Sequence, residues 1–81
     1  SVNEIEIISK INLYPNPSTG IFHVEGVNIS HIDVMDEMGK LIISLDNQST
    51  IDLSALRQGV YYARFSNKQG STSQQKLVVI K

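Results

Sequence analysis

Short runs of alternating apolar and polar residues recur along the chain, separated by residues that favour turns. The clearest run is 21–25, where Phe22 and Val24 fall on one face of an extended strand and His23 falls on the other. No segment keeps a helical period over three turns. The runs predict strands at 11–14, 21–25, 30–36, 40–46, 50–53, 60–66 and 71–80, with a weaker alternation at 4–9.

The same alternation predicts which side chains point into a core. Besides Phe22 and Val24, the expected inward-facing residues are Ile32, Val34, Leu41, Ile43, Leu45, Ile51 and Leu53. Turns are expected at 15–20, which holds two prolines, at 36–39 and at 67–70. About seven strands of this length predict an all-β fold: a small immunoglobulin-like antiparallel β-sandwich with Greek-key connections.

Composition supports this fold class. Ile, Val and Thr contribute 21 of the 81 residues against two Ala, a bias that suits half-buried strands. A chain of this length forms one domain with a thin core. The chain opens on Ser1 without a basic and then apolar leader, so we expect it to be part of a longer protein. We expect residues 1–10 to be a linker or a first edge strand, and residues 11–81 to be the domain.

The segment from Leu56 to Tyr61 has the L-x-x-G-x-Y spacing of a tyrosine corner, with Gly59 at its centre. In such a corner, a tyrosine near the start of a strand donates a hydrogen bond to the backbone a few residues upstream. This spacing predicts a structural role for Tyr61, not a catalytic one.

Charge excludes several classes of partner. The net charge of −1 gives no basic field for nucleic acid, and no apolar run is long enough for a transmembrane segment. Residues 1–55 hold all eight acids and two lysines, whereas residues 56–81 hold five basic residues and no acid. We expect acidic and basic strands to become neighbours and to neutralise each other, although such asymmetry can also mark an interaction tail.

Candidate chemistry is sparse. Without cysteine there is no thiol catalysis or zinc–thiolate site, and the chain has no nucleophile elbow or P-loop. If the strands 21–25 and 30–36 paired antiparallel, His23 would face Asp33 and Glu25 would face His31. Two imidazoles and two carboxylates could hold zinc, but a solvated polar face explains the same pattern and is favoured. We expect neither an enzyme nor a bound metal or cofactor.

Five segments, taken in order, resemble one known family. They are 13–20 (LYPNPSTG), 32–40 (IDVMDEMGK), 51–54 (IDLS), 59–62 (GVYY) and 76–81 (KLVVIK). In order and spacing they are similar to the type A C-terminal sorting domain of the type IX secretion system. The likeness covers roughly residues 11–81 and leaves residues 1–10 as a variable linker.

The resemblance implies a signal. A parent protein reaches the periplasm, and the outer-membrane translocon recognises the folded domain and exports the N-terminal cargo to the cell surface or medium. A sortase-like peptidase usually then cuts at or before residues 1–10. It further implies that recognition involves the terminal residues Lys76, Leu77, Val78, Val79, Ile80 and Lys81. The motif residues expected to be scaffold are Pro15, Asn16, Pro17, Gly20, Gly39, Lys40, Gly59 and Tyr61.

The terminal run permits two interpretations of its own. The apolar segment 77–80 between Lys76 and Lys81 could lie near a sheet edge and be recognised by strand addition, with the lysines discouraging unwanted pairing. Alternatively, Leu77 and Val79 are simply core. An open edge would also permit an edge-strand dimer. The competing function is a retained immunoglobulin-like adhesion or carbohydrate-binding module, with an exposed patch at Tyr14, at Tyr62 or on the His23 and His31 face.

Overall fold

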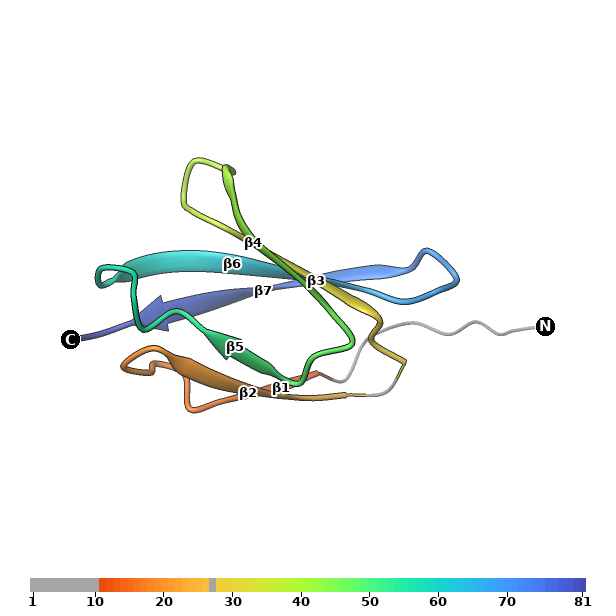
Figure 1. Ribbon diagram of the computed structural model, residues 1–81, viewed down its shortest axis with the longest axis horizontal. Helices are drawn as coiled ribbons and strands as arrows, with labels where there is room; N and C mark the ends of the chain where they lie inside the picture. Colours follow the sequence, from red (N-terminus) through yellow and green to blue (C-terminus); the bar gives the residue numbers. More distant parts are fainter. Residues whose placement is uncertain (1–10, 27) are drawn as a thin grey trace.

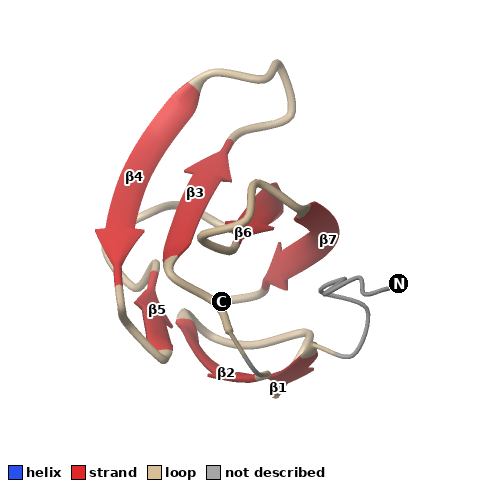
Figure 2. Ribbon diagram, turned by 90° about the vertical axis from the view of Figure 1, so that its right-hand side faces the viewer, coloured by secondary structure: helices blue, strands red, loops and turns tan. Residues whose placement is uncertain are grey.

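Two antiparallel sheets stack as layers, as Figures 1 and 2 show for the computed structural model of the protein. The structure describes residues 11–26 and 28–81. The strands are β1 (Asn12–Tyr14), β2 (Ile21–Glu25), β3 (His31–Met35), β4 (Leu41–Asp46), β5 (Thr50–Asp52), β6 (Gly59–Ser66) and β7 (Thr72–Val79). The first sheet has the order β1-β2-β5 and the second the order β4-β3-β6-β7.

The sequence predictions of strand position hold closely. Each of the seven expected strands is present, and its ends lie within about two residues of those predicted. The all-β, sandwich-like fold is therefore confirmed, while the Greek-key description of its connections stays a prediction. The expected linker or first strand at 1–10 lies outside the described residues. Within the described ranges, no helix is long and apolar enough to cross a membrane.

The core lies between the two sheets. Within the strands, its buried side chains come from β2, β3, β5, β6 and β7, at alternate positions, because successive side chains of a strand point to opposite faces. The buried hydrophobic residues are Ile11, Phe22, Val24, Ile32, Val34, Ile51, Leu53, Tyr61, Ala63, Phe65, Leu77 and Val79. The prediction of inward-facing residues was thus right for β2, β3 and β5.

One predicted core residue, Leu41, is on the surface. Its side chain is 55% exposed, because β4 carries one more residue than its partner at this point. Val34 pairs with Ile43 whereas Met35 pairs with Leu41, so the register shifts between the two pairs. Such a bulge reverses the alternation of faces. Leu41 therefore lies opposite Met35 on the outer face, while Ile43 packs against the core.

The tyrosine corner is present. The Tyr61 hydroxyl donates a 2.8 Å hydrogen bond to the carbonyl oxygen of Arg57, and the ring is buried between the sheets. This bond ties the start of β6 to the loop that leaves β5. The hydrogen bond that the sequence spacing predicted for Tyr61 is thereby confirmed.

Replacing Tyr61 with Phe is expected to lower the free energy of unfolding by about 1 kcal/mol, because the Arg57 carbonyl loses its partner while the ring still fills the core. Urea unfolding followed by circular dichroism measures this change. Tyr62→Phe, at the next position on the opposite face, is the matched control. Equal stability of Tyr61→Phe and the wild type would contradict the expected role of the hydroxyl.

Candidate functional site

The terminal strand β7 lies at one edge of the four-stranded sheet, paired on one side with β6. Leu77 and Val79 point inward and are 0% and 1% exposed. The strand thus lies at an edge of its sheet, and two of its residues are core. Recognition by strand addition stays a prediction. The opposite face of this segment carries Lys76 and Val78, and Ile80, which follows the strand, is 49% exposed.

The free edge of this strand is already occupied by residues 15–18, which we call the edge loop. The Asn16 side chain acts like a peptide group: its Nδ2 donates to the Lys76 carbonyl at 2.9 Å, and its Oδ1 accepts from the Val78 amide at 3.1 Å. Next, the Ser18 amide donates to Val78 O and the Ile80 amide donates to Ser18 O, at 3.0 and 2.8 Å. Four outward backbone groups of 76–80 thus find partners within the domain.

The edge loop is built so that pairing stops there. Pro15 and Pro17 have no N–H to offer a further strand, and both are preceded by cis peptide bonds. Ser18 is buried, and its hydroxyl donates to Ile21 O at 2.6 Å and accepts from the Gly20 amide at 3.1 Å. Protection of the edge therefore comes from this loop, a role that the sequence analysis assigned to the flanking lysines.

The other motif residues hold turns. The Asp36 carboxylate accepts from the amides of Met38 and Lys40, and the Gly39 amide donates to Asp36 O, which closes the β3–β4 turn. Lys81 is tied back to the β5–β6 loop, because its Nζ donates to Ser54 O at 2.9 Å.

Ser54 also donates twice to Asp52, from its hydroxyl and from its amide. These two hydrogen bonds lower the pKa of the Asp52 carboxyl below its ordinary 3.8. The Asp52 side chain thereby caps the turn that follows β5.

A polar network covers half of the outer face of the four-stranded sheet. The His31 ring lies between two carboxylates, with Nδ1 at 2.6 Å from Asp46 and Nε2 at 2.7 Å from Asp33. Ser44 donates to Asp33 at 2.7 Å, and Arg64 lies 3.6 Å from it. The Arg64–Asp33 pair confirms that acidic and basic strands become neighbours.

The hydrogen bonds of this network shift two pKa values. Hydrogen bonding to Asp46 and then to Asp33 raises the pKa of His31 above 6.5. For Asp33, burial raises the pKa, but hydrogen bonds from Ser44 and His31 outweigh it and hold the pKa below 3.8.

NMR titration of the His31 ring is expected to give a midpoint above 6.5, and Asp46→Asn should bring it down. Because the folded pKa is raised, the network contributes stability that is complete below pH 6.5 and is lost as the pH rises through the folded pKa. Asp46→Asn should therefore destabilise the domain at pH 6 and matter little in alkaline solution. A His31 midpoint that does not change in Asp46→Asn would contradict this.

The hypothetical pairing of the strands 21–25 and 30–36 is wrong. His23 pairs with Tyr14 of β1 and Thr50 of β5 in one sheet, while His31 and Asp33 lie in the other. The reason is that β2 and β3 contribute their apolar faces to opposite sides of the same core. Within residues 11–26 and 28–81, no three His, Asp or Glu side chains are grouped so that they could hold a metal ion.

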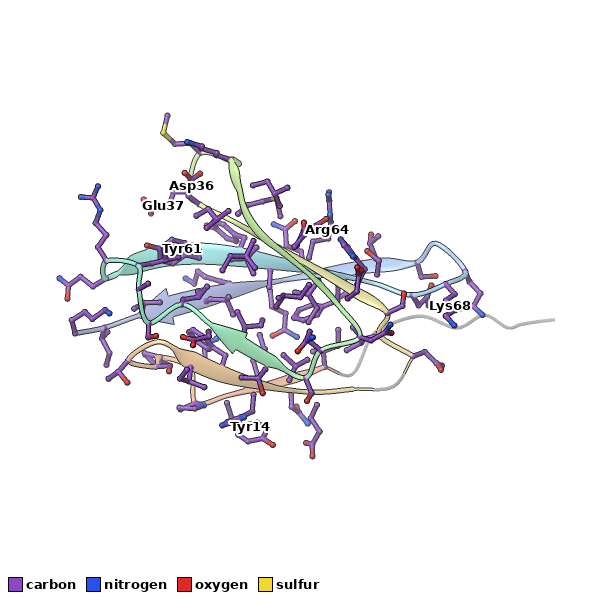
Figure 3. All side chains as sticks on the ribbon, viewed as in Figure 1. Tyr14, Asp36, Glu37, Tyr61, Arg64 and Lys68 are labelled. Atoms are coloured by element: carbon purple, nitrogen blue, oxygen red, sulfur yellow. The ribbon has the colours of Figure 1, made fainter. Side chains whose placement is uncertain are left out.

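The aromatic residues of the competing binding function are separated in the same way. The Tyr14 ring packs against the His23 ring at a tilt of 37°, with centroids 5.6 Å apart, on the outer side of the three-stranded sheet. Tyr62 and His31 lie on the outer side of the other sheet. Figure 3 shows Tyr14 and Arg64 on opposite sides of the molecule. Thus His23 and His31 form no common face.

The order of the sequence motifs from residue 13 to residue 81 agrees with one family. The family described as secretion system C-terminal sorting domain matches residues 12–81, nearly the whole chain. The chain belongs to this family. No curated protein matches it significantly. Membership indicates a sorting signal of the type IX secretion system, which directs export across the outer membrane to the cell surface or extracellular space. The sorting domain thus acts with secretion machinery and with a cargo chain.

Sequence reasoning missed the part of the sorting domain that closes its edge. Asn16 was assigned to the scaffold as a turn residue, but its side chain contacts residues 60 positions away. The sequence did contain one indication: Asn16 stands between two prolines, and its amide side chain can donate and accept hydrogen bonds as a strand backbone does. The spacing of the motif alone does not show which strand Asn16 would bond.

Proposed function

We propose that the sorting domain is recognised in its folded state by the outer-membrane translocon through its terminal segment, Lys76 to Lys81, and is then removed from the cargo by a sortase-like peptidase. The observation that supports this most is the state of that segment. It is a formed edge strand with two core side chains and a solvent-facing side at Val78 and Ile80. A linear signal would not need such an anchored strand.

The remaining motif residues hold this segment in place through contacts within the domain. Asn16 and Ser18 hold its edge, Gly20 and Ser54 bring the neighbouring loops together, and Tyr61 fixes the strand beside it. Their hydrogen bonds are used within the domain, which suits a scaffold. In this proposal, the peptidase cuts at or before residues 1–10. The cargo is then released or attached to the cell surface.

The test is a fusion of an N-terminal export signal and a fluorescent cargo to residues 1–81, expressed in a Gram-negative host that has this secretion system. The wild-type fusion should leave the periplasm and appear outside, shortened by the domain. Ile80→Glu should reduce this export by about tenfold or more, because it puts an unpaired charge into the contact. Ile80 is 49% exposed, so the fold should tolerate the change.

Thr72→Glu is the matched control, because it introduces the same charge on the outer face of β7 at its polar end, opposite Ser66. Export of Ile80→Glu at the wild-type level would remove the terminal segment from recognition. A wild-type fusion that stays periplasmic and uncut would favour a retained binding module instead.

A further inference from the structure

The outer face of the four-stranded sheet is divided into a polar half and an apolar half. The polar half holds the His31 network. In the apolar half, cross-strand register places Leu41 opposite Met35, Met35 opposite Tyr62 and Tyr62 opposite Lys76. The next pair toward the end of β7 is Val60 with Val78. A row across all four strands and an adjacent pair therefore form a nearly apolar surface.

These side chains are accessible. Leu41 is 55% exposed, and Met35, Val60, Tyr62 and Val78 are half-buried. A shallow hollow continues the surface toward the β3–β4 turn, and its lining residues are Met35, Asp36, Glu37, Gly39, Tyr62 and Gln74. Figure 3 shows Asp36 and Glu37 at that turn. A contiguous apolar patch rimmed by charged residues is typical of a protein interaction site.

The other sides of the terminal strand are closed. Its inner face is core, with Leu77 and Val79 buried. Its edge is bonded to the edge loop at Lys76, Val78 and Ile80. Strand addition at 76–80 would have to displace the edge loop and break its four hydrogen bonds to this segment. The outer face is what remains open to a partner.

We propose that the secretion machinery reads the sorting domain through this outer apolar half, the surface formed by Leu41, Met35, Tyr62, Lys76, Val60 and Val78, and not by adding a strand to its edge. This inference rests on the proposed function, since it specifies how the terminal segment is recognised. The surface is shared by β3, β4, β6 and β7, so most of it lies outside the terminal segment.

The charge of the surface indicates the chemistry of the partner. Lys76 is the charged member of the row, and Asp36 and Glu37 line the hollow that continues the surface. A partner that covers the row must therefore offer an apolar surface with a carboxylate opposite the Lys76 ammonium group. Such a pair sets orientation, while burial of Tyr62 and the aliphatic side chains supplies affinity.

The test uses substitutions in β6, because they alter the outer face of the sheet without altering the edge of β7. Recognition by strand addition and recognition through the outer face therefore predict different results. Tyr62→Thr combined with Val60→Thr keeps strand propensity but removes the outer apolar side chains, and leaves the β7 edge intact. In the cargo fusion, this double variant should lose export by about tenfold or more. Arg64→Thr, on the same strand and face but in the polar half, should lose no more than about twofold. Thermal unfolding of each purified domain, with Tyr62→Thr alone as a milder variant, identifies folded proteins.

The outcomes separate this inference from the proposed function. If Ile80→Glu blocks export while the folded β6 variants are exported normally, the terminal segment is recognised but not through the shared face, and the inference fails. If Ile80→Glu is also exported normally, the proposed function fails first. If the wild-type domain is a dimer in solution that Tyr62→Thr makes monomeric, a second copy covers the face and the inference is overturned.

Discussion

A chain that ends at Gln75 is expected to be unfolded at 25 °C. The missing residues include Leu77 and Val79, which are 0% and 1% exposed, and their burial alone is worth about 3–6 kcal/mol. The four hydrogen bonds between the edge loop and β7 are lost as well. A domain of this size has a total stability of roughly 4–12 kcal/mol. Far-ultraviolet circular dichroism during heating should show no cooperative transition for the truncated chain.

The control for this truncation keeps the strand and changes only its outer face. Lys76→Thr, Val78→Thr and Ile80→Thr together leave Leu77 and Val79 in place, so this triple variant should still unfold cooperatively. A cooperative transition in the truncated chain would mean that the core closes without β7. The practical consequence concerns export assays: loss of export after truncation reports unfolding, so recognition must be tested with substitutions on the surface.

Gly20→Ala is expected to destabilise the domain by about 2–6 kcal/mol, because it combines backbone strain with overlap of atoms. Gly20 has a φ of +150°, and a Cβ placed there would lie 2.6 Å from Ser54 Cα. That contact is with backbone, which cannot move aside without breaking the bond from the Leu53 amide to Gly20 O. Chemical denaturation of the purified variant measures the loss.

Gly59→Ala separates the two causes. Gly59 has a similar φ of +154°, but a Cβ there would meet nothing within 4 Å. It should therefore lose about 1–3 kcal/mol through strain alone. Equal losses at the two glycines would show that the approach of Ser54 costs nothing.

The strands of this fold could be predicted from sequence because each carries its own local pattern. Phe22 and Val24, or Ile32 and Val34, alternate with polar residues, and alternation is a property of neighbouring positions. The tyrosine corner was equally local, since the hydroxyl of Tyr61 bonds a carbonyl only four residues away. Leu41 marks the limit: a bulge depends on how two strands pair, which the pattern of one strand does not contain.

The candidate site could be predicted in part. The terminal run identified β7 and its two faces, but neither the edge loop nor the row from Leu41 to Lys76 followed from it. Both depend on which strands become neighbours. His23 and Asp33 show the same limit, because reasonable alternation in two consecutive strands suggested a pairing that the sandwich does not make.

The bonds between Asn16 and β7 join positions about 60 residues apart in the chain. The edge of β7 is therefore finished only when the beginning and the end of the domain have both folded. Damage to the edge loop leaves the edge of β7 unprotected, and damage to β7 removes one strand from the outer face. If the translocon recognises the folded domain as proposed, a domain damaged at either end is expected to lose the sorting signal completely.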